Sequence, residues 1–296
     1  MASGNAYSDG EKPFPGIGLE KTVSGGGKPF PGKYVRACLP WIRRAGAVAL
    51  DLLYPPRCAV CDGLLRKGED GCCADCRAAL PWVREPACMK CGKPVADFRQ
   101  EYCDDCARTR HFFARGVAAF TYTGAMRQSV HRLKSVNRRD ALDFYAAAMA
   151  QALEPHLSAW QPQMLIPVPM YRKKQVQRGY NQAELLARRI GGRVGIPVET
   201  GLVRCTRRHA PQKTLGREAR MRNLSGCFAV TRQLEIGCRL LLVDDVYTTG
   251  STVDELARVL REAGAGAVYF LVLCTGKGKK TVCTAENVCY TKIPDR

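Results

Sequence analysis

Apolar positions in the carboxyl-terminal two thirds of the chain follow two alternating patterns. Strands are predicted at residues 239–243 and 267–273, because residues 240–243 and 267–273 are continuous apolar runs, as expected for strands that are buried on both faces of a sheet. Between them, residues 251–263 place Val253, Leu256 and Leu260 on one face of a helix. Strands are also predicted at residues 116–122, 164–168 and 227–230, and helices at residues 125–133, 139–153 and 181–190. This alternation predicts an α/β fold with a doubly wound parallel sheet.

The first 57 residues differ in character from the rest of the chain. The sequence Lys-Pro-Phe-Pro-Gly occurs at residues 12–16 and again at residues 28–32. Such a Pro/Gly-rich stretch buries too little surface to offset its ordering entropy, so residues 1–33 are predicted to form a disordered tail. Residues 34–57 predict an amphipathic helix that Pro55 and Pro56 bring to an end. That helix could lie on a membrane or pack on the neighbouring domain, and we favour packing.

The charge of the chain restricts its partners without identifying one. The formal net charge is +19 and the pI is about 9.5, which favours polyanions such as nucleic acid, pyrophosphate-bearing substrates or an acidic membrane surface. The longest early apolar run, residues 45–53, contains Asp51 and is too short to span a bilayer. No secretory signal is visible. We therefore expect a cytoplasmic protein without a transmembrane segment.

Eight of the sixteen cysteines stand in four C-x-x-C pairs within residues 58–110. Two such pairs supply the four thiolates of a closed tetrahedral zinc site, so the spacing predicts a double zinc ribbon with structural Zn²⁺. Disulfides are disfavoured by a cytoplasmic location, and redox cysteines are expected at a strand–helix junction rather than in a small loop-rich module. Cys72 falls outside the spacing. The predicted metal ligands are Cys58, Cys61, Cys73, Cys76, Cys88, Cys91, Cys103 and Cys106.

A candidate phosphate site follows the strand at residues 239–243. Asp244 and Asp245 end this strand, and a hydroxyl-rich loop leads into the next helix. Backbone N–H groups and hydroxyls at a helix N-terminus favour a phosphate, and Gly250 lets the backbone approach it closely. The two carboxylates can accept hydrogen bonds from ribose hydroxyls or help to hold Mg²⁺. The predicted site for a 5-phosphoribosyl group consists of Asp244 and Asp245 as catalytic residues, followed by Val246, Tyr247, Thr248, Thr249, Gly250, Ser251 and Thr252.

The alternative for this segment is an ordinary strand, turn and capped helix. A helix cap needs one hydroxyl residue, whereas four hydroxyl residues surround a glycine here, directly after two aspartates. The sequence therefore favours a ligand site over a simple cap.

Cations gather near two other segments that could complete this site. A stiff proline turn at residues 167–169 is followed by a basic stretch, and such a turn can cradle pyrophosphate, although a basic surface loop would look similar. Residues 211–223 form a long polar segment whose cations could close over the ligand as a lid. The predicted pyrophosphate contacts are Lys134, Pro167, Val168, Pro169, Arg178, Arg217 and Arg222.

Taken in order, these segments resemble the ComF (competence protein F) family, and residues 243–252 resemble the signature of type I phosphoribosyltransferases. The resemblance extends from residue 50 to residue 273 and includes the run Arg178-Gly179-Tyr180-Asn181-Gln182. It implies a small N-terminal zinc-ribbon module at residues 58–110, a type I phosphoribosyltransferase-like domain at residues 111–275 and a basic tail at residues 276–296. It also implies binding of phosphoribosyl diphosphate (PRPP) with Mg²⁺, glycosyltransferase activity and a role in DNA uptake during natural competence, alongside competence helicase-type partners.

Two functions remain open at the level of sequence. The first is an enzyme that binds PRPP with Mg²⁺ and transfers or hydrolyses its ribosyl group. The second is a non-catalytic competence factor that keeps the fold and binds single-stranded DNA through its basic surface. That mode pairs cations with stacking aromatic side chains, for which Tyr171, Tyr180 and Tyr247 are the candidates near the basic loops.

Overall fold

The computed structural model describes residues 55–136, 138–206 and 226–276 and two short strands at residues 281–283 and 289–291. The chain divides into two units, residues 1–53 and residues 54–296, and every described residue belongs to the second. The tail predicted at residues 1–33, the helical part of residues 34–57 and the lid predicted at residues 211–223 therefore lie outside the described residues.

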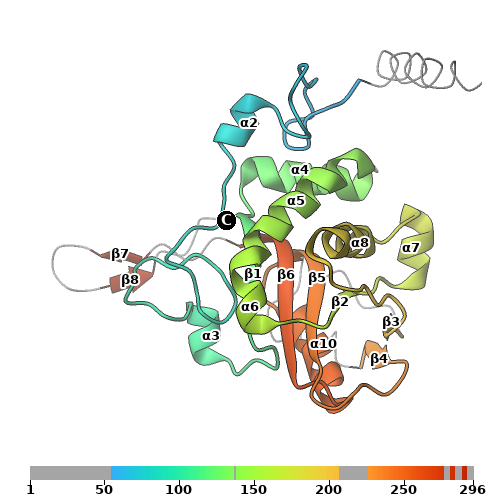
Figure 1. The fold of residues 1–296 in the computed structure, drawn as a ribbon. Coiled ribbons are helices and arrows are strands. Elements are labelled where there is room, and N and C mark those ends of the chain that lie inside the picture. Colours follow the sequence, from blue (N-terminus) through green and yellow to red (C-terminus); the bar gives the residue numbers. More distant parts are fainter. Residues whose placement is uncertain (1–54, 137, 207–225, 277–280, 284–288, 292–296) are drawn as a thin grey trace, which may run out of the picture. The chain divides into compact units, whose positions relative to one another are not determined.

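The centre of the fold is a four-stranded parallel sheet in the order β1-β6-β5-β2 (Figure 1). Its strands are β1 (Gly116–Thr121), β2 (Met164–Pro167), β5 (Arg239–Tyr247) and β6 (Ala267–Thr275). Leu240, Leu241, Leu242 and Val243 of β5 are fully buried, as the continuous apolar run predicts. Because the strands are parallel, their carboxyl ends meet at one edge of the sheet, and Asp244 and Asp245 lie at that edge.

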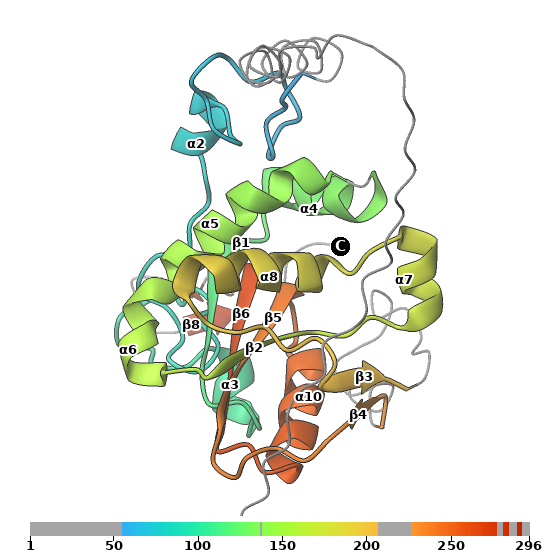
Figure 2. The same ribbon diagram turned by 45° about the vertical axis from the view of Figure 1, so that its right-hand side comes forward.

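Helices cover both faces of the sheet, so the alternating side chains of the strands contribute to two cores. Leu241 and Val243 belong to the core that includes α5 (Leu142–Leu153) and α8 (Gln182–Val194). Leu240 and Leu242 belong to the core that includes α10 (Ser251–Glu262). Helix α8 runs across the strands, whereas α10 lies on the other side of the sheet (Figure 2). This arrangement is the doubly wound parallel sheet that the sequence predicts.

The remaining elements are short, apart from α4 (Gly124–Ser135), which follows β1. They are α2 (Ala74–Ala78), α3 (Asp104–Arg108), η1 (Arg139–Ala141), η2 (Glu154–His156), α6 (Leu157–Trp160), α7 (Arg172–Arg178), β3 (Val203–Cys205), β4 (Phe228–Val230), β7 (Thr281–Cys283) and β8 (Cys289–Thr291). Strands β3 and β4 form an antiparallel pair of their own, as do β7 and β8.

Three details differ from the predicted elements. The helix predicted at residues 139–153 begins with a turn of 3₁₀ helix, η1, before α5 starts at Leu142. The strand predicted at residues 227–230 lies outside the main sheet, because it pairs with β3. The basic stretch after the proline turn forms helix α7, which ends at Gly179 with φ of 82°. A short basic run without a clear apolar face carries little periodicity, so this helix was not predicted.

Candidate functional site

The acidic pair at the end of β5 is asymmetric. Asp245 is buried, accepts a hydrogen bond from Gln182 Nε2 at 2.7 Å and lies 2.8 Å from Lys134 Nζ. Asp244 is only partly buried, and its Oδ1 accepts a hydrogen bond from the backbone N–H of Asp245 at 2.8 Å. One carboxylate is thus neutralised by its surroundings, while the other retains oxygen lone pairs for a ligand.

The two carboxyl groups also differ in their affinity for protons. Burial and the adjacent charge of Asp245 raise the pKa of Asp244 from the ordinary 3.8 to about 7. Burial acts in the same direction on Asp245, but Lys134 and the hydrogen bond from Gln182 hold the pKa of that carboxyl below its usual value. Asp245 therefore stays ionised, whereas Asp244 changes its charge near neutral pH.

A chain of polar side chains from three elements surrounds Asp245. Lys134 is on α4, Gln182 is the first residue of α8, and Arg178 at the end of α7 donates from Nη1 to Gln182 Oε1 at 2.6 Å. Lys134 and Arg178 were predicted as pyrophosphate contacts, and the structure brings both to the acidic pair, Lys134 directly and Arg178 through Gln182. The N-cap Asn181, which accepts a hydrogen bond from Ala183 N at 3.1 Å, fixes the start of α8 next to this site.

The proline turn is held against the end of β5. Val168 N donates to Val243 O at 2.9 Å, and Asn181 Nδ2 donates to Val168 O at 3.0 Å. Pro167, Val168 and Pro169 thus lie beside the acidic pair as a rigid wall. The other two predicted pyrophosphate contacts, Arg217 and Arg222, lie outside the described residues.

The loop after the acidic pair presents hydroxyls at the start of α10. Thr248 is exposed, Thr249 is partly buried, and Thr249 Oγ1 lies 3.0 Å from Ser251 Oγ. Gly250 is the N-cap of α10, and as a glycine it supplies no side chain to cap the helix. The N–H groups in the first turn of a helix lack partners within the helix, so this end is suited to an anion. Val246 and Thr252, also predicted for the site, flank this loop and are partly buried.

Gly250 is required by its surroundings as well as by its backbone. Its φ is 79°, and a Cβ atom placed on it would lie 2.5 Å from the hydroxyl oxygen of Tyr247. Tyr247 is itself buried and stacks on Phe270, with ring centroids 4.7 Å apart. Tyr247 is thus a packing residue beneath the loop. Tyr180 is buried as well, so neither tyrosine is available to stack on DNA bases.

The eight predicted metal ligands gather into two tetrads. The Sγ atoms of Cys58, Cys61, Cys73 and Cys76 lie within 4.8 Å of one another, as do those of Cys88, Cys91, Cys103 and Cys106. The Sγ atoms are 3.8 Å apart in the pair Cys61–Cys73 and 3.6 Å apart in the pair Cys91–Cys103. Four thiolates about 2.3 Å from one tetrahedral zinc ion would be separated by about 3.8 Å, so both tetrads fit structural Zn²⁺.

The protonation of the thiols fits a cation at each centre. Hydrogen bonding to Cys103 together with burial raises the pKa of Cys91, and burial with hydrogen bonding to Cys73 raises that of Cys76. Hydrogen bonds with Cys103 and Cys106 lower the pKa of Cys88 and of Cys103, respectively. Crowded thiols thus resist ionising together unless a cation balances them.

Cys72 lies 3.9 Å from Cys58, Sγ to Sγ, but is not a member of the tetrad. Burial, with the charge of Cys58, raises the pKa of Cys72 to about 12.

Each tetrad packs against a different part of the candidate site. Near the first, Ala59 O accepts hydrogen bonds from Ser129 Oγ at 2.6 Å and Tyr145 Oη at 2.8 Å; Ser129 is on α4, the helix that carries Lys134. Near the second, Lys93 is buried, contacts Asp105 at 2.8 Å and places its Nζ 5.4 Å from the centre of the Tyr247 ring. Both ribbons therefore support elements of the acidic, hydroxyl-rich site.

Sequence reasoning missed several residues that position the site. Gln182 appeared only as part of a motif, and its contact with Asp245 requires the packing of α8 on β5. His111 Nδ1 lies 2.5 Å from Asp254 Oδ2, in the first turn of α10, across a separation of 143 residues. Because a carboxylate only accepts, Nδ1 carries the proton in this pair. A scattered histidine and an aspartate within a helix give no sign in sequence that they pair.

The fold and its two cysteine tetrads define a class of protein. The chain joins a small double zinc ribbon to an α/β domain with a parallel sheet. A family model for the double zinc ribbon domain matches residues 49–107. Within the described part of the chain, no helix is long and apolar enough to cross a membrane.

Comparison with known proteins identifies the family. Competence protein F of Haemophilus influenzae is 30% identical over 214 residues, covering 70% of this chain and 92% of that protein. DNA utilization protein YhgH of Salmonella typhimurium is 31% identical over 230 residues, covering 75% of this chain and 98% of that protein. Competence protein ComFC of Bacillus subtilis is 26% identical over 215 residues, covering 69% of this chain and 83% of that protein. The chain belongs to the competence protein F family.

Solved structures give weaker matches. A purine phosphoribosyltransferase from Pyrococcus horikoshii is 14% identical with a TM-score of 0.28, covering 46% of this chain and 85% of that one. The hypoxanthine-guanine phosphoribosyltransferase of Leishmania donovani (L.donovani) is 15% identical with a TM-score of 0.29, covering 45% of this chain and 67% of that one. Similarity at this level reveals nothing about the activity of the chain.

Proposed function

We propose that this protein binds PRPP with Mg²⁺ at the carboxyl edge of its parallel sheet. The observation that carries the proposal is the partly buried Asp244, which retains free oxygen lone pairs directly before the uncapped N-terminus of α10. In this arrangement the 5-phosphate lies on residues 248–252, and the ribose hydroxyls reach the acidic pair. The proposed domains are the double zinc ribbon at residues 58–110 and the phosphoribosyltransferase domain at residues 111–275.

The acidic pair has the chemistry that a magnesium site requires. Mg²⁺ prefers hard oxygen ligands and is usually held by one or two carboxylates together with substrate oxygens. Asp244 offers its oxygens to such an ion, while Asp245 is already bound by Lys134 and Gln182. When bound, the ion would neutralise charge on the pyrophosphate. Asp245 then orients Lys134 and Gln182 around the ligand.

The cations around the acidic pair suit the departure of pyrophosphate. In ribosyl transfer the bond between the anomeric carbon and the pyrophosphate oxygen breaks, and a bond to the acceptor forms. Lys134 and Arg178 lie where they can stabilise the negative charge that develops on the leaving group. The proline turn at residues 167–169 limits the approach of water from its side. Arg217 and Arg222 are proposed as further contacts from the segment at residues 211–223.

The biological setting that we propose is DNA uptake in the cytoplasm during natural competence, with competence helicase-type proteins and single-stranded DNA as partners. Support comes from relatives named competence proteins and DNA utilization proteins and from the net charge of +19. The alternative is a competence factor that binds single-stranded DNA and has no catalytic activity. The burial of Tyr180 and Tyr247 removes two of its three candidate stacking residues.

The test is calorimetric titration of the zinc-loaded protein with PRPP and Mg²⁺, compared with the double variant Asp244→Asn/Asp245→Asn. Asparagine keeps the size of each side chain, and circular dichroism checks that the variant is folded. Binding to the wild type that is lost in the folded variant supports the proposal. A folded, zinc-loaded wild type that binds no PRPP, but binds single-stranded DNA with steep salt dependence, would support the alternative.

A further inference from the structure

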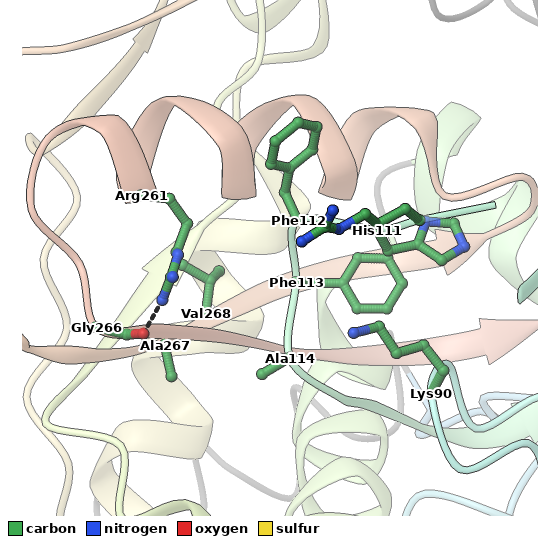
Figure 3. Close-up of a pocket in the computed structure, with 10 residues that line it drawn as sticks. Lys90, His111, Phe112, Phe113, Ala114, Arg261, Gly266, Ala267 and Val268 are labelled. Atoms are coloured by element: carbon green, nitrogen blue, oxygen red, sulfur yellow. Dashed lines mark hydrogen bonds between the residues drawn. The ribbon is translucent and has the colours of Figure 1, made fainter.

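A pocket lies on the face of the sheet that α10 covers (Figure 3). Its volume is about 520 Å³, and its walls come from Lys90 of the second zinc ribbon, from the segment before β1, from the end of α10 and from the start of β6. Ala267 at the start of β6 pairs with Arg239, whereas Val272 pairs with Asp244. At about 3.3 Å per residue, these two levels are about 16 Å apart along the strands. None of the residues that line the pocket belongs to the loop at residues 244–252.

The charge of this pocket is positive and unbalanced. Lys90, Arg110 and Arg261 line it, and no aspartate or glutamate does. Arg261 Nη1 donates to the backbone oxygen of Gly266, which leaves its positive charge without a counterion (Figure 3). Within the described part of the chain, no carboxylate pairs with any of these three cations. Three cations that line one pocket without acidic partners favour an anionic ligand.

An aromatic wall stands beside these cations. The side chain of Phe112 is 54% exposed, whereas Phe113 is buried and has Lys90 Nζ 5.4 Å from its ring centre. The wall is held in place from both ends. Phe112 N donates to Asp254 Oδ1 at 3.0 Å, and Ala114 N donates to Val268 O at 2.7 Å. An exposed ring on a fixed backbone offers a stacking surface at little entropic cost.

From this combination we infer that the pocket binds a nucleotide, with the base against Phe112 and the phosphate among Lys90, Arg110 and Arg261. The volume lies within the range of sites for small organic ligands. Cations alone would suit any anion, and an exposed ring alone would suit any flat ligand. A ligand that carries both a phosphate and a planar ring satisfies the two features together. This site is separate from the proposed PRPP site, and its occupancy does not depend on PRPP binding.

The nucleotide is either a free molecule or one unit of single-stranded DNA, and one photolabelling experiment separates the two sources. The full-length, zinc-loaded protein carrying Asp244→Asn/Asp245→Asn is photolabelled with 8-azidoadenosine 5′-monophosphate. Labelled peptides are then mapped by mass spectrometry. We expect the label on residues 111–115. Competition by a short oligodeoxythymidylate would identify a strand as the source, and competition by AMP alone would identify a free nucleotide.

Matched variants decide whether this pocket is the part of the protein that binds AMP. Arg110→Ala/Phe112→Ala removes one exposed cation and one exposed ring from the pocket, and Phe98→Ala/Arg99→Ala removes the same two types from another exposed surface. In calorimetric titration with AMP, the first variant should bind at least about tenfold more weakly than the second. Equal affinities, or a label confined to other parts of the chain, would overturn the assignment. Because the acidic pair is already substituted, this result is independent of PRPP binding.

Discussion

Lys134 Nζ lies 2.8 Å from the carboxylate of Asp245, which links α4 to the end of β5 across 111 residues of sequence. The Asp245 side chain is 6% exposed and that of Lys134 is 31% exposed, so the pair is shielded from solvent more than a surface ion pair is. Leu133, which precedes Lys134 on α4, accepts a hydrogen bond from Tyr180 Oη at its backbone oxygen. This bond fixes the end of α4 against the turn before α8. The acidic pair is therefore built around a fixed cation.

Loss of that cation should affect both stability and binding. Lys134→Met leaves a buried Asp245 without its counterion, and we expect the free energy of unfolding to fall by about 3 kcal/mol. Adding Asp245→Asn should restore most of that stability, since no buried charge remains, but should not restore PRPP binding. Chemical denaturation and calorimetry of the single and double variants measure the two effects. Lys173→Met, which removes an exposed lysine of α7, is the control and should change neither.

The raised pKa of Asp244 predicts that stability falls and PRPP affinity rises as the pH increases. The pKa is about 7 in the folded protein against an ordinary 3.8, so between these values the unfolded chain releases a proton that the folded protein keeps. Stability therefore falls as the pH rises from about 4 through 7. A pKa shift of this size changes the free energy of unfolding by about 4 kcal/mol at most. Because Asp244 is partly exposed, we expect a change of about 2 kcal/mol.

Asp244→Asn removes this titration. The variant should be more stable than the wild type at pH 8 and about equally stable at pH 4, as thermal unfolding at both pH values would show. Wild-type affinity for PRPP with Mg²⁺ should rise as the pH passes through 7, because the proposed ligand of Mg²⁺ is the ionised carboxylate of Asp244. A wild-type affinity that does not change between pH 6 and pH 8 would contradict this role for Asp244.

Gly250→Ala should disrupt the loop more than backbone strain alone can explain. Both Gly250 and Gly237 have positive φ, 79° and 85°, but a Cβ on Gly250 would meet Tyr247 whereas a Cβ on Gly237 would meet nothing within 4 Å. Gly237→Ala thus measures the cost of the backbone conformation, about 1 kcal/mol. Gly250→Ala should cost at least about 1 kcal/mol more and weaken PRPP binding at least tenfold. Equal losses of stability in the two variants would show that Tyr247 moves aside freely.

Local spacing predicted the features whose chemistry is local. The four C-x-x-C pairs and the order of strand, acidic pair, hydroxyl loop and helix are each contained in short stretches, and the structure forms them as such. The buried run at residues 240–243 likewise marked β5 correctly. In these segments, apolar periodicity, glycine placement and ligand spacing all favour the same structure.

Contacts between distant segments could not be predicted in this way. The sequence predicts that Lys134 contacts pyrophosphate, but its pairing with Asp245 depends on how α4 is placed over the sheet. The same holds for His111 with Asp254 and for the pairing of β4 with β3. Each depends on the packing of whole elements, for which a single sequence carries no signal.

The contact between the second ribbon and the loop predicts that zinc affects ligand binding. Cys88, Cys91 and Cys103 share a hydrophobic core with Tyr247 and Val253, on either side of the loop. Loss of a ligand to the metal would loosen this ribbon. Because Lys93 lies over the ring of Tyr247, it would also loosen Tyr247, which packs beneath the loop. Cys103→Ser should therefore reduce the zinc content from two ions per chain to one and weaken PRPP binding at least tenfold.

The first ribbon provides the matched comparison, because Cys73 occupies the equivalent position as the N-cap of α2, as Cys103 does for α3. Cys73→Ser should also remove one zinc ion and lower the melting temperature, since Ser129 and Tyr145 lose a fixed partner at Ala59. Its effect on PRPP affinity should be smaller, because the first ribbon contacts Ser129 of α4 and Tyr145 of α5 rather than the residues beneath the loop. Metal analysis, thermal unfolding and calorimetry on the same samples separate these effects. Full PRPP affinity in Cys103→Ser, with one zinc ion lost, would show that the loop keeps its shape without the second ribbon.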